Sequence, residues 1–155
     1  MHEKSSRFKR ITFFKIYLTN TSIRSAMFSP IDYTDDEMGL MVETAIYAQW
    51  MHEKNDSLRY ARWKVGQTEG EVDMVAIDTL KQKATWCLEI KWSNRFITRP
   101  IELKSLFYFC ELNNLNTATV TTIDKDLSLM YNNVQLRFIP AAVYAFKIGY
   151  YSITK

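Results

Sequence analysis

Apolar and polar residues alternate along two neighbouring stretches near the middle of the chain, and this pattern predicts two β-strands. The first strand is expected over Glu71–Asp78 and the second over Ala84–Trp92, with a short polar turn, Thr79–Lys83, between them. Successive side chains of a strand point to opposite faces of a sheet, so each stretch presents two sets of side chains. Both sets are largely apolar, which is typical of inner strands that are covered on both faces.

Four charged residues interrupt these apolar stretches. Glu71 and Asp73 share one face of the first strand, and Glu89 and Lys91 share one face of the second. Charged groups inside a buried sheet are costly unless they are paired or bind a metal ion. The cluster is therefore a candidate functional site, and a buried salt-bridge network without any metal is the structural alternative.

A further carboxylate is expected from a helix that precedes these strands. Thr34 and Glu37 fit a capping box, and the helix should run from there to about residue 52 or 53. Between Met38 and Met51 its only charged residue is Glu43, which lies on an apolar helical stripe with Ile46. Glu43 is either a member of the site or a carboxylate at the rim of the apolar face, hydrogen-bonded to a basic side chain.

The remaining segments predict an α/β fold with a central mixed β-sheet flanked by helices. Further strands are expected over Ile11–Thr19, Leu58–Val65, Thr117–Ile123 and Val134–Ile139. Further helices are expected over Ser22–Phe28, from Thr98 through Pro100 to about Asn113, and over Ala141–Lys147. We expect residues 1–30 to form a lead-in segment, a strand and a short helix, that packs on a domain over residues 31–155.

The spacing Asp73-x15-Glu89-x-Lys91, with Glu43 on a preceding helix, resembles the PD-(D/E)XK nuclease superfamily. More narrowly, GEVDMV followed by LEIKWS is similar to the C-terminal domain found behind an AAA-type ATPase module in many bacterial and archaeal proteins. The segment KIYLTNTSIRSAMF near the start is similar to that family's lysine–aliphatic–tyrosine segment ahead of the acidic helix. The resemblance covers most of the chain and implies a restriction-endonuclease-like core.

The same resemblance implies roles for the clustered side chains. Asp73 and Glu89 would bind Mg²⁺ directly, with Mn²⁺ as a substitute, and Glu43 would complete the set of metal ligands from the helix. Carboxylates that hold such ions polarise water and clamp phosphate oxygens. Lys91 would be the catalytic lysine, which orients or activates the water. Glu71 is an extra acid on the same face, expected to support the metal ligands or to contact a basic side chain.

Three basic residues follow the motif, namely Arg95, Arg99 and Lys104. They are candidates for contacts with the phosphate backbone of a nucleic acid. A solvated helix surface is the alternative explanation for all three.

Composition narrows the function classes further. A chain of 155 residues with 47% apolar content suits one globular domain. Cys87 and Cys110 lie in apolar elements, which favours buried reduced thiols in a cytoplasmic protein. No membrane span, signal peptide or phosphate-binding loop is visible. The formal net charge of +3 arises from residues 1–30, which hold six basic residues and one acidic residue.

These observations lead to three hypotheses. The first is a Mg²⁺-dependent nuclease-like domain that acts on nucleic acid, with DNA favoured over RNA, and that is normally attached to an AAA-type ATPase in cis or in trans. The second is a non-catalytic partner-recognition or assembly module of such an ATPase, and the third is a plain nucleic-acid binder that uses its basic N-terminal arm. We expect no association with membranes, and a homodimer is compatible with the first hypothesis.

Overall fold

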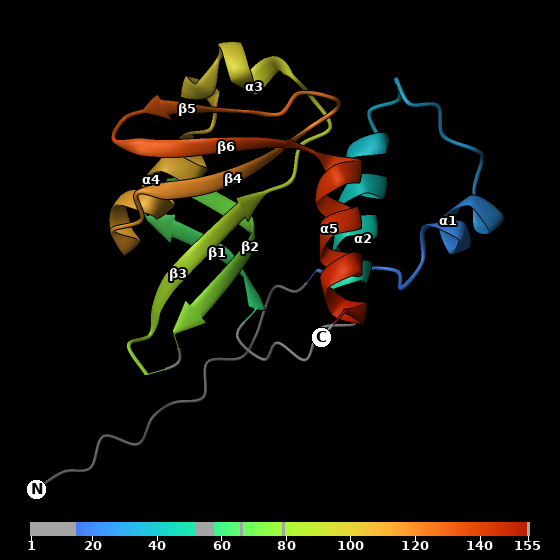
Figure 1. Ribbon diagram of the computed structural model, residues 1–155, viewed down its shortest axis with the longest axis horizontal. Coiled ribbons are helices and arrows are strands. Elements are labelled where there is room, and N and C mark those ends of the chain that lie inside the picture. Colours follow the sequence, from blue (N-terminus) through green and yellow to red (C-terminus); the bar gives the residue numbers. More distant parts are fainter. Residues whose placement is uncertain (1–14, 52–57, 66, 79, 155) are drawn as a thin grey trace, which may run out of the picture.

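The computed structural model describes residues 15–51, 58–65, 67–78 and 80–154, and it shows a six-stranded sheet flanked by helices (Figure 1). The strands are β1 (Leu58–Val65), β2 (Thr68–Asp78), β3 (Lys83–Glu89), β4 (Thr117–Thr122), β5 (Leu127–Tyr131) and β6 (Val134–Pro140). The helices are α1 (Thr21–Met27), α2 (Met38–Trp50), α3 (Arg95–Thr98), α4 (Lys104–Asn113) and α5 (Ala141–Ile153), with a 3-10 turn η1 (Pro100–Glu102).

The sheet is mixed, in the order β1-β2-β3-β4-β6-β5. Pairing is antiparallel from β1 to β3 and between β5 and β6, and it is parallel from β3 through β4 to β6. The parallel step from β3 to β4 requires a crossover, which α3, η1 and α4 supply. The predicted α/β architecture with a mixed sheet between helices is confirmed. Among the described helices, none has both the length and the apolar character needed to cross a membrane.

Helices cover both faces of the sheet. On one face α4 closes an apolar cluster that includes Val72, Cys87 and Leu106. On the other face α2 and α5 lie side by side over a second cluster, which includes Met74 and Leu88 (Figure 1). The central strands are thus buried on both sides, as their apolar composition predicts.

The alternation of side chains along β2 is interrupted at Asp73 and Met74. The β1–β2 register shifts by one residue here, so that two residues of β2 stand opposite Tyr60 of β1, which is a β-bulge. Val72 and Val75 consequently both join the cluster under α4, whereas Met74 joins the cluster under α2 and α5. Uninterrupted alternation along the predicted strand Glu71–Asp78 would place Val72 and Met74 on one face and Val75 on the other, and the bulge makes this expectation wrong.

The expected capping box before α2 is also absent. The helix begins at Met38, and Glu37 at its N-cap makes no side-chain capping bond. Thr34 instead donates its hydroxyl to Asp32 Oδ1 (2.9 Å), which also accepts the Thr34 backbone N–H at 3.1 Å. This local Asx turn competes with helix initiation at Thr34, so the prediction of Thr34 as the N-cap is wrong.

The lead-in segment differs from its predicted form. Residues 11–14 of the expected strand lie outside the described residues, and residues 15–19 belong to no strand. The predicted strand is therefore wrong for the part that can be assessed. Lys15 and Tyr17 make side-chain contacts to α2 and β2 in place of a strand ladder. The short helix that follows is confirmed as α1.

Strand β3 ends earlier than the pattern predicts. Its parallel pairing with β4 stops at Glu89, and the chain leaves the sheet at Ile90 in place of Trp92. The structure also contains β5, which the sequence did not suggest, and α5 extends to Ile153, beyond the expected end at Lys147.

Candidate functional site

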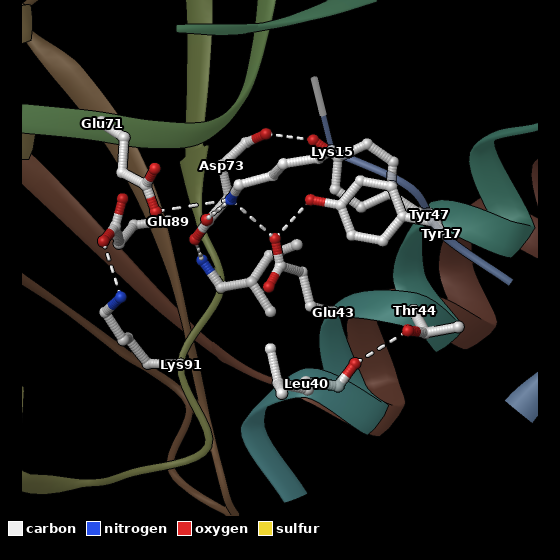
Figure 2. A network of polar contacts seen from close by, with 11 residues as sticks. Lys15, Tyr17, Leu40, Glu43, Thr44, Tyr47, Glu71, Asp73, Glu89 and Lys91 are labelled. Carbon is white, nitrogen blue, oxygen red and sulfur yellow. Dashed lines mark hydrogen bonds and ion pairs between the residues drawn. The ribbon is translucent and has the colours of Figure 1, made fainter. Parts of the chain in front are cut away.

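Three of the predicted carboxylates converge on one ammonium group (Figure 2). Lys15 Nζ lies 3.0 Å from Glu43 Oε1, 3.2 Å from Asp73 Oδ1 and 3.4 Å from Glu71 Oε1. Glu43 comes from α2, whereas Glu71 and Asp73 come from β2 around its bulge. The site therefore joins the lead-in segment, a helix and a central strand. We call Glu43, Glu71 and Asp73 with Lys15 the Lys15 cluster.

The charge of the Lys15 cluster is partly shielded from solvent. The side chains of Lys15, Glu43 and Asp73 are 24%, 14% and 9% exposed, whereas that of Glu71 is 49% exposed. Burial by itself lowers the pKa of Lys15, but the charges of Asp73 and Glu43 and their hydrogen bonds outweigh it, so the pKa is raised. Lys15 is thus a permanent cation at physiological pH.

Two stacked tyrosines hold the cluster from the side of α2. The rings of Tyr17 and Tyr47 lie 3.8 Å apart with an interplanar angle of 15°. The Tyr17 hydroxyl donates to Glu43 Oε1, and the Tyr47 hydroxyl donates to the backbone carbonyl of Asp73 (Figure 2). Burial, followed by the nearby acids, raises the pKa of both phenols, that of Tyr47 to about 12. Both hydroxyls therefore remain protonated donors.

Glu89 and Lys91 form the second part of the site, at the end of β3. Lys91 Nζ lies 2.7 Å from Glu89 Oε1. Glu89 Oε2 is buried and makes no hydrogen bond with any residue that the structure describes. Burial, and then the charge of Asp73, raises the pKa of Glu89 to about 7, although Lys91 opposes the shift. Glu89 is thus a carboxylate with a free buried oxygen beside the Lys15 cluster.

The main chain around Lys91 is fixed by β4. The backbone N–H of Lys91 donates to Thr121 Oγ1 at 2.7 Å, and Thr121 Oγ1 donates to the Lys91 carbonyl at 2.8 Å. Thr121 is fully buried. This pair of bonds replaces the strand ladder that ends at Glu89, so Lys91 is held although it lies outside the sheet.

A cavity of about 750 Å³ opens on the α4 side of the sheet, next to Glu89 and Lys91. Its other walls include Trp63 from β1, and Lys104 and Tyr108 from α4. Lys104 is exposed and forms no ion pair with another described residue. The cavity lining thus combines three cationic side chains, three carboxylates (Glu69, Glu89 and Glu102) and aromatic rings.

Only part of the predicted phosphate-contacting set lies at this cavity. Arg95 and Lys104 line it, but Arg99 is absent from the lining. Arg95 Nε pairs with Glu102 Oε2 at 3.0 Å, and Arg99 Nη1 lies 3.7 Å from Glu102 Oε1. The 67% exposed Arg99 side chain matches the solvated-surface alternative.

These residues match a divalent cation in donor type but not in arrangement. Within the described part of the chain, no group of three or more His, Cys, Asp or Glu side chains is arranged to hold a metal ion. The three carboxylate oxygens of the Lys15 cluster and the free Glu89 Oε2 are nevertheless the type of ligand that Mg²⁺ prefers. The residues therefore match Mg²⁺ in the chemistry of their donor atoms, whereas the position among three of the carboxylates is taken by the Lys15 ammonium.

Sequence reasoning assigned no role to Lys15, Tyr17, Tyr47 or Thr121. One usable signal was the alternation in Lys15-Ile16-Tyr17, which places the ammonium and the phenol on the same side of an extended segment. Tyr47 follows Glu43 by one helical turn, a spacing that brings two side chains to the same face. Thr121 carried no signal, because its partner lies 30 residues away in the chain.

Comparison with protein-family models, curated proteins and solved structures gives no match to this chain. The likeness to the PD-(D/E)XK superfamily consequently rests on the residues themselves. The structure brings Glu43, Asp73, Glu89 and Lys91 into one region, which is an observation about geometry and does not identify a family.

Proposed function

We propose that this chain is a Mg²⁺-dependent nuclease-like domain that hydrolyses nucleic-acid phosphodiesters, with DNA as the first substrate to test. The observation that carries the proposal is the meeting of Glu43, Asp73 and Glu89 beside Lys91, where one buried Glu89 oxygen has no partner among the described residues. A buried carboxylate oxygen of this kind requires a proton or a cation. A restriction-endonuclease-like core is part of the same proposal.

The carboxylates would act as the cation ligands. Mg²⁺ would be bound by Asp73, Glu89 and Glu43, and Mn²⁺ would be able to replace it. When bound, the ion supplies positive charge that activates water and stabilises the phosphate. Tyr17 orients Glu43 by donating to its Oε1, and Tyr47 fixes the backbone of Asp73.

Lys91 acts through its charge in this proposal. Burial lowers its pKa, but the charges of Glu89 and Asp73 outweigh burial and raise it. A lysine that stays protonated is a hydrogen-bond donor and an electrostatic partner for a phosphate oxygen, and it is a poor general base. Its side chain is 32% exposed and lines the cavity, so it is accessible to a substrate.

The cavity beside Lys91 is the proposed place of the substrate strand. Lys104 and Arg95 on its wall offer positive charge to the phosphates that flank the scissile bond. The rings of Trp63 and Tyr108, whose centroids lie 5.6 Å apart, offer a surface on which a base can stack.

Cleavage of duplex and single-stranded DNA in the presence of Mg²⁺ or Mn²⁺ tests the proposal. Asp73→Ala and Lys91→Ala should abolish cleavage while circular dichroism shows a retained fold. Lys83→Ala, an exposed lysine on the same strand as Glu89, is the matched control and should cleave normally. Cleavage that persists in both Asp73→Ala and Lys91→Ala would reject the proposal.

A non-catalytic module that serves an AAA-type ATPase is the second candidate function. It is favoured by the Lys15 cluster, in which three carboxylates already share an internal cation. On this alternative the purified chain binds no Mg²⁺, and replacement of Glu89 or Lys91 lowers stability by leaving the other charge buried and unpaired. Unchanged melting temperatures in those two variants would count against it.

A further inference from the structure

The two cysteines of the chain meet inside the apolar cluster under α4. Cys87 comes from β3 and Cys110 from α4, and their Sγ atoms lie 3.8 Å apart in a thiol–thiol hydrogen bond. Both residues are fully buried. The sequence holds only these two thiols, and the fold brings them to one point although 23 positions separate them in the chain.

This arrangement is close to that of a covalent bond. The sulfur atoms of a disulfide lie about 2.05 Å apart, so each Sγ atom has to move by roughly 1 Å to reach its partner. The described side chains that form the core cluster around the pair, among them Val75 and Leu106, are apolar. They offer the thiols no hydrogen-bond partner that would hold the two sulfurs apart.

We infer that Cys87 and Cys110 form an oxidation site, a dithiol that a hydroperoxide converts into a reversible disulfide between β3 and α4. The inference does not depend on the proposed nuclease function. Thiols that only fill space in the core are the structural alternative, and these would stay reduced in the folded protein.

The end of α4 gives an oxidant a route to the pair. Cys110 lies in the last turn of this helix, which ends at Asn113, and terminal turns open at a lower free-energy cost than the centre of a fold. A cavity of about 300 Å³ lies at the same end. Its lining includes Phe109, which precedes Cys110, and Val75, which pairs with Cys87 across the two strands. The path from this cavity to the thiols is therefore short.

The hydrogen bond within the pair distinguishes the two sulfurs. It raises the pKa of Cys87, as burial also does, and it lowers the pKa of Cys110. Cys110 is therefore the sulfur that becomes a thiolate and attacks the oxidant.

The reaction with hydrogen peroxide runs in two balanced steps. The Cys110 thiolate attacks one peroxide oxygen, the O–O bond breaks, and a sulfenic acid forms, while the second oxygen leaves as hydroxide and takes up the thiol proton to become water. The Cys87 sulfur then attacks Cys110 Sγ and the S–O bond breaks. Hydroxide leaves with the Cys87 proton as a second water. Two thiols are oxidised to one disulfide, and an external thiol reverses the change.

The new bond would join two walls of the cavity beside Lys91. Glu89, two residues after Cys87 on β3, lines this cavity, and so do Lys104 and Tyr108 on α4. Because a disulfide shortens the distance between the two sulfurs, oxidation would hold this part of α4 against β3. The redox state of the pair would thus fix the separation of the cavity walls.

Oxidation of the folded full chain tests the inference. Reduced protein is treated with hydrogen peroxide without denaturant, and the remaining thiols are then alkylated in denaturant. Mass spectrometry should show a monomer that has lost two hydrogens and accepts no alkyl group, with a tryptic link between residues 84–91 and 105–125. Dithiothreitol should restore both thiols. Thiols that both stay reduced, or sulfinic acid without a disulfide, would overturn the inference.

Single serine variants test which sulfur attacks. In the presence of dimedone, which traps sulfenic acids, peroxide should label Cys87→Ser at Cys110. Cys110→Ser should be labelled on the order of tenfold more slowly, because the thiolate fraction falls tenfold for each unit by which the pKa rises. Equal labelling of the two variants would overturn the assignment of Cys110 as the attacking sulfur. The mass measurement on the wild type needs neither variant.

Thermal unfolding gives a second readout of the bond. A disulfide restricts the unfolded chain, so the oxidised wild type should melt above the reduced protein by on the order of 5 °C, and dithiothreitol should remove the gain. Cys87→Ser is the matched control, and peroxide should not raise its melting temperature. An oxidised wild type that melts below the reduced protein would overturn the inference, because the bond would then strain the core.

Discussion

The Asp73 carboxylate accepts the backbone N–H of Ile90 at 2.8 Å, across the gap where β2 and β3 part. The last pair of residues that the two strands share is Met74 with Leu88. Beyond that pair the Ile90 N–H has no main-chain acceptor on β2, and it donates to Asp73 Oδ2 of the β2 bulge. Asp73 therefore stabilises the end of β3 as well as contributing a charge to the site.

Replacement of Asp73 by Asn or Ala should separate these two roles. Both variants lose the charge that faces Lys15, but Asn keeps an oxygen that can accept the Ile90 N–H. We expect Asp73→Ala to lose about 1–3 kcal/mol more free energy of unfolding than Asp73→Asn, because it leaves that buried N–H without a partner. Urea denaturation measures the difference. Equal stability of the two variants would show that the bond to Ile90 contributes little.

Stability should depend on pH through Glu89 in the metal-free protein. The pKa of this carboxyl is raised from 4.5 to about 7, chiefly by burial and then by Asp73. Between those values the folded state holds a proton that the unfolded chain releases, so the free energy of unfolding should fall as the pH rises from about 4.5 to 7. Glu89→Gln should flatten this part of the curve, measured by urea denaturation in EDTA.

The control for the pH experiment is Glu111→Gln, which changes an exposed acid on α4. It should keep the slope of the wild type across the same range. A wild-type curve that rises over this range, or one that Glu89→Gln leaves unchanged, would contradict the assignment to Glu89.

Gly70 sets the distance between β2 and α4 at the rim of the cavity. A Cβ atom at this position would lie 2.7 Å from Trp63 Cε2 and 2.9 Å from Ser105 Oγ. Gly70→Ala should therefore cost about 1–3 kcal/mol of stability through overpacking. Gly39→Ala is the matched control, because a Cβ on Gly39 meets no atom within 4 Å and a helical alanine stabilises by up to about 1 kcal/mol. Calorimetry should thus show a lower melting temperature for Gly70→Ala and a higher one for Gly39→Ala, each relative to the wild type.

Lys104 should contribute to DNA affinity through its charge alone. It lines the cavity and forms no ion pair with another described residue. Lys104→Ala should weaken DNA binding at low salt and reduce the slope of log affinity against log salt by about one. Fluorescence anisotropy in EDTA, with Lys83→Ala as the control, measures both quantities. If Lys104→Ala leaves the slope of log affinity against log salt unchanged, the DNA phosphates do not contact Lys104.

Periodicity predicted the elements well where one face is buried and the run is long. The strands around Val72 and Leu88 and the helix around Ile46 follow from their spacing of apolar residues. The bulge at Asp73 did not follow, because register is decided by pairing with β1 and not by the β2 sequence alone.

The missed strand β5 shows a second limit. Its side chains alternate between half-buried and exposed positions on the edge of the sheet, so its apolar pattern is weak. Its hairpin to β6 turns on Asn132 and Asn133, which both have positive φ values, 48° and 61°. Such pairs are typical of two-residue hairpin turns, and the Asn-Asn pair was the signal that would have found it.

The site could be predicted as a set of acids but not as an arrangement. The spacing indicated Asp73, Glu89 and Lys91, because neighbouring strands bring such residues together. The partner of the acids, Lys15, lies 58 residues before Asp73 in the sequence. No local pattern encodes a contact over that separation, since it depends on how the segment before α1 crosses α2.

The position of Lys15 also changes how this chain can be divided. A fragment that starts at residue 31 would contain every strand that the structure describes and the four clustered acids, yet it would lose the Lys15 ammonium and the Tyr17 hydroxyl that contact them. Recombination or protein engineering that exchanges such domains would have to carry residues 15–20 along with the sheet. Residues 15–20 therefore act on the sheet domain as a bound ligand would, by placing the Lys15 ammonium and the Tyr17 hydroxyl against its acids, although they belong to the same chain.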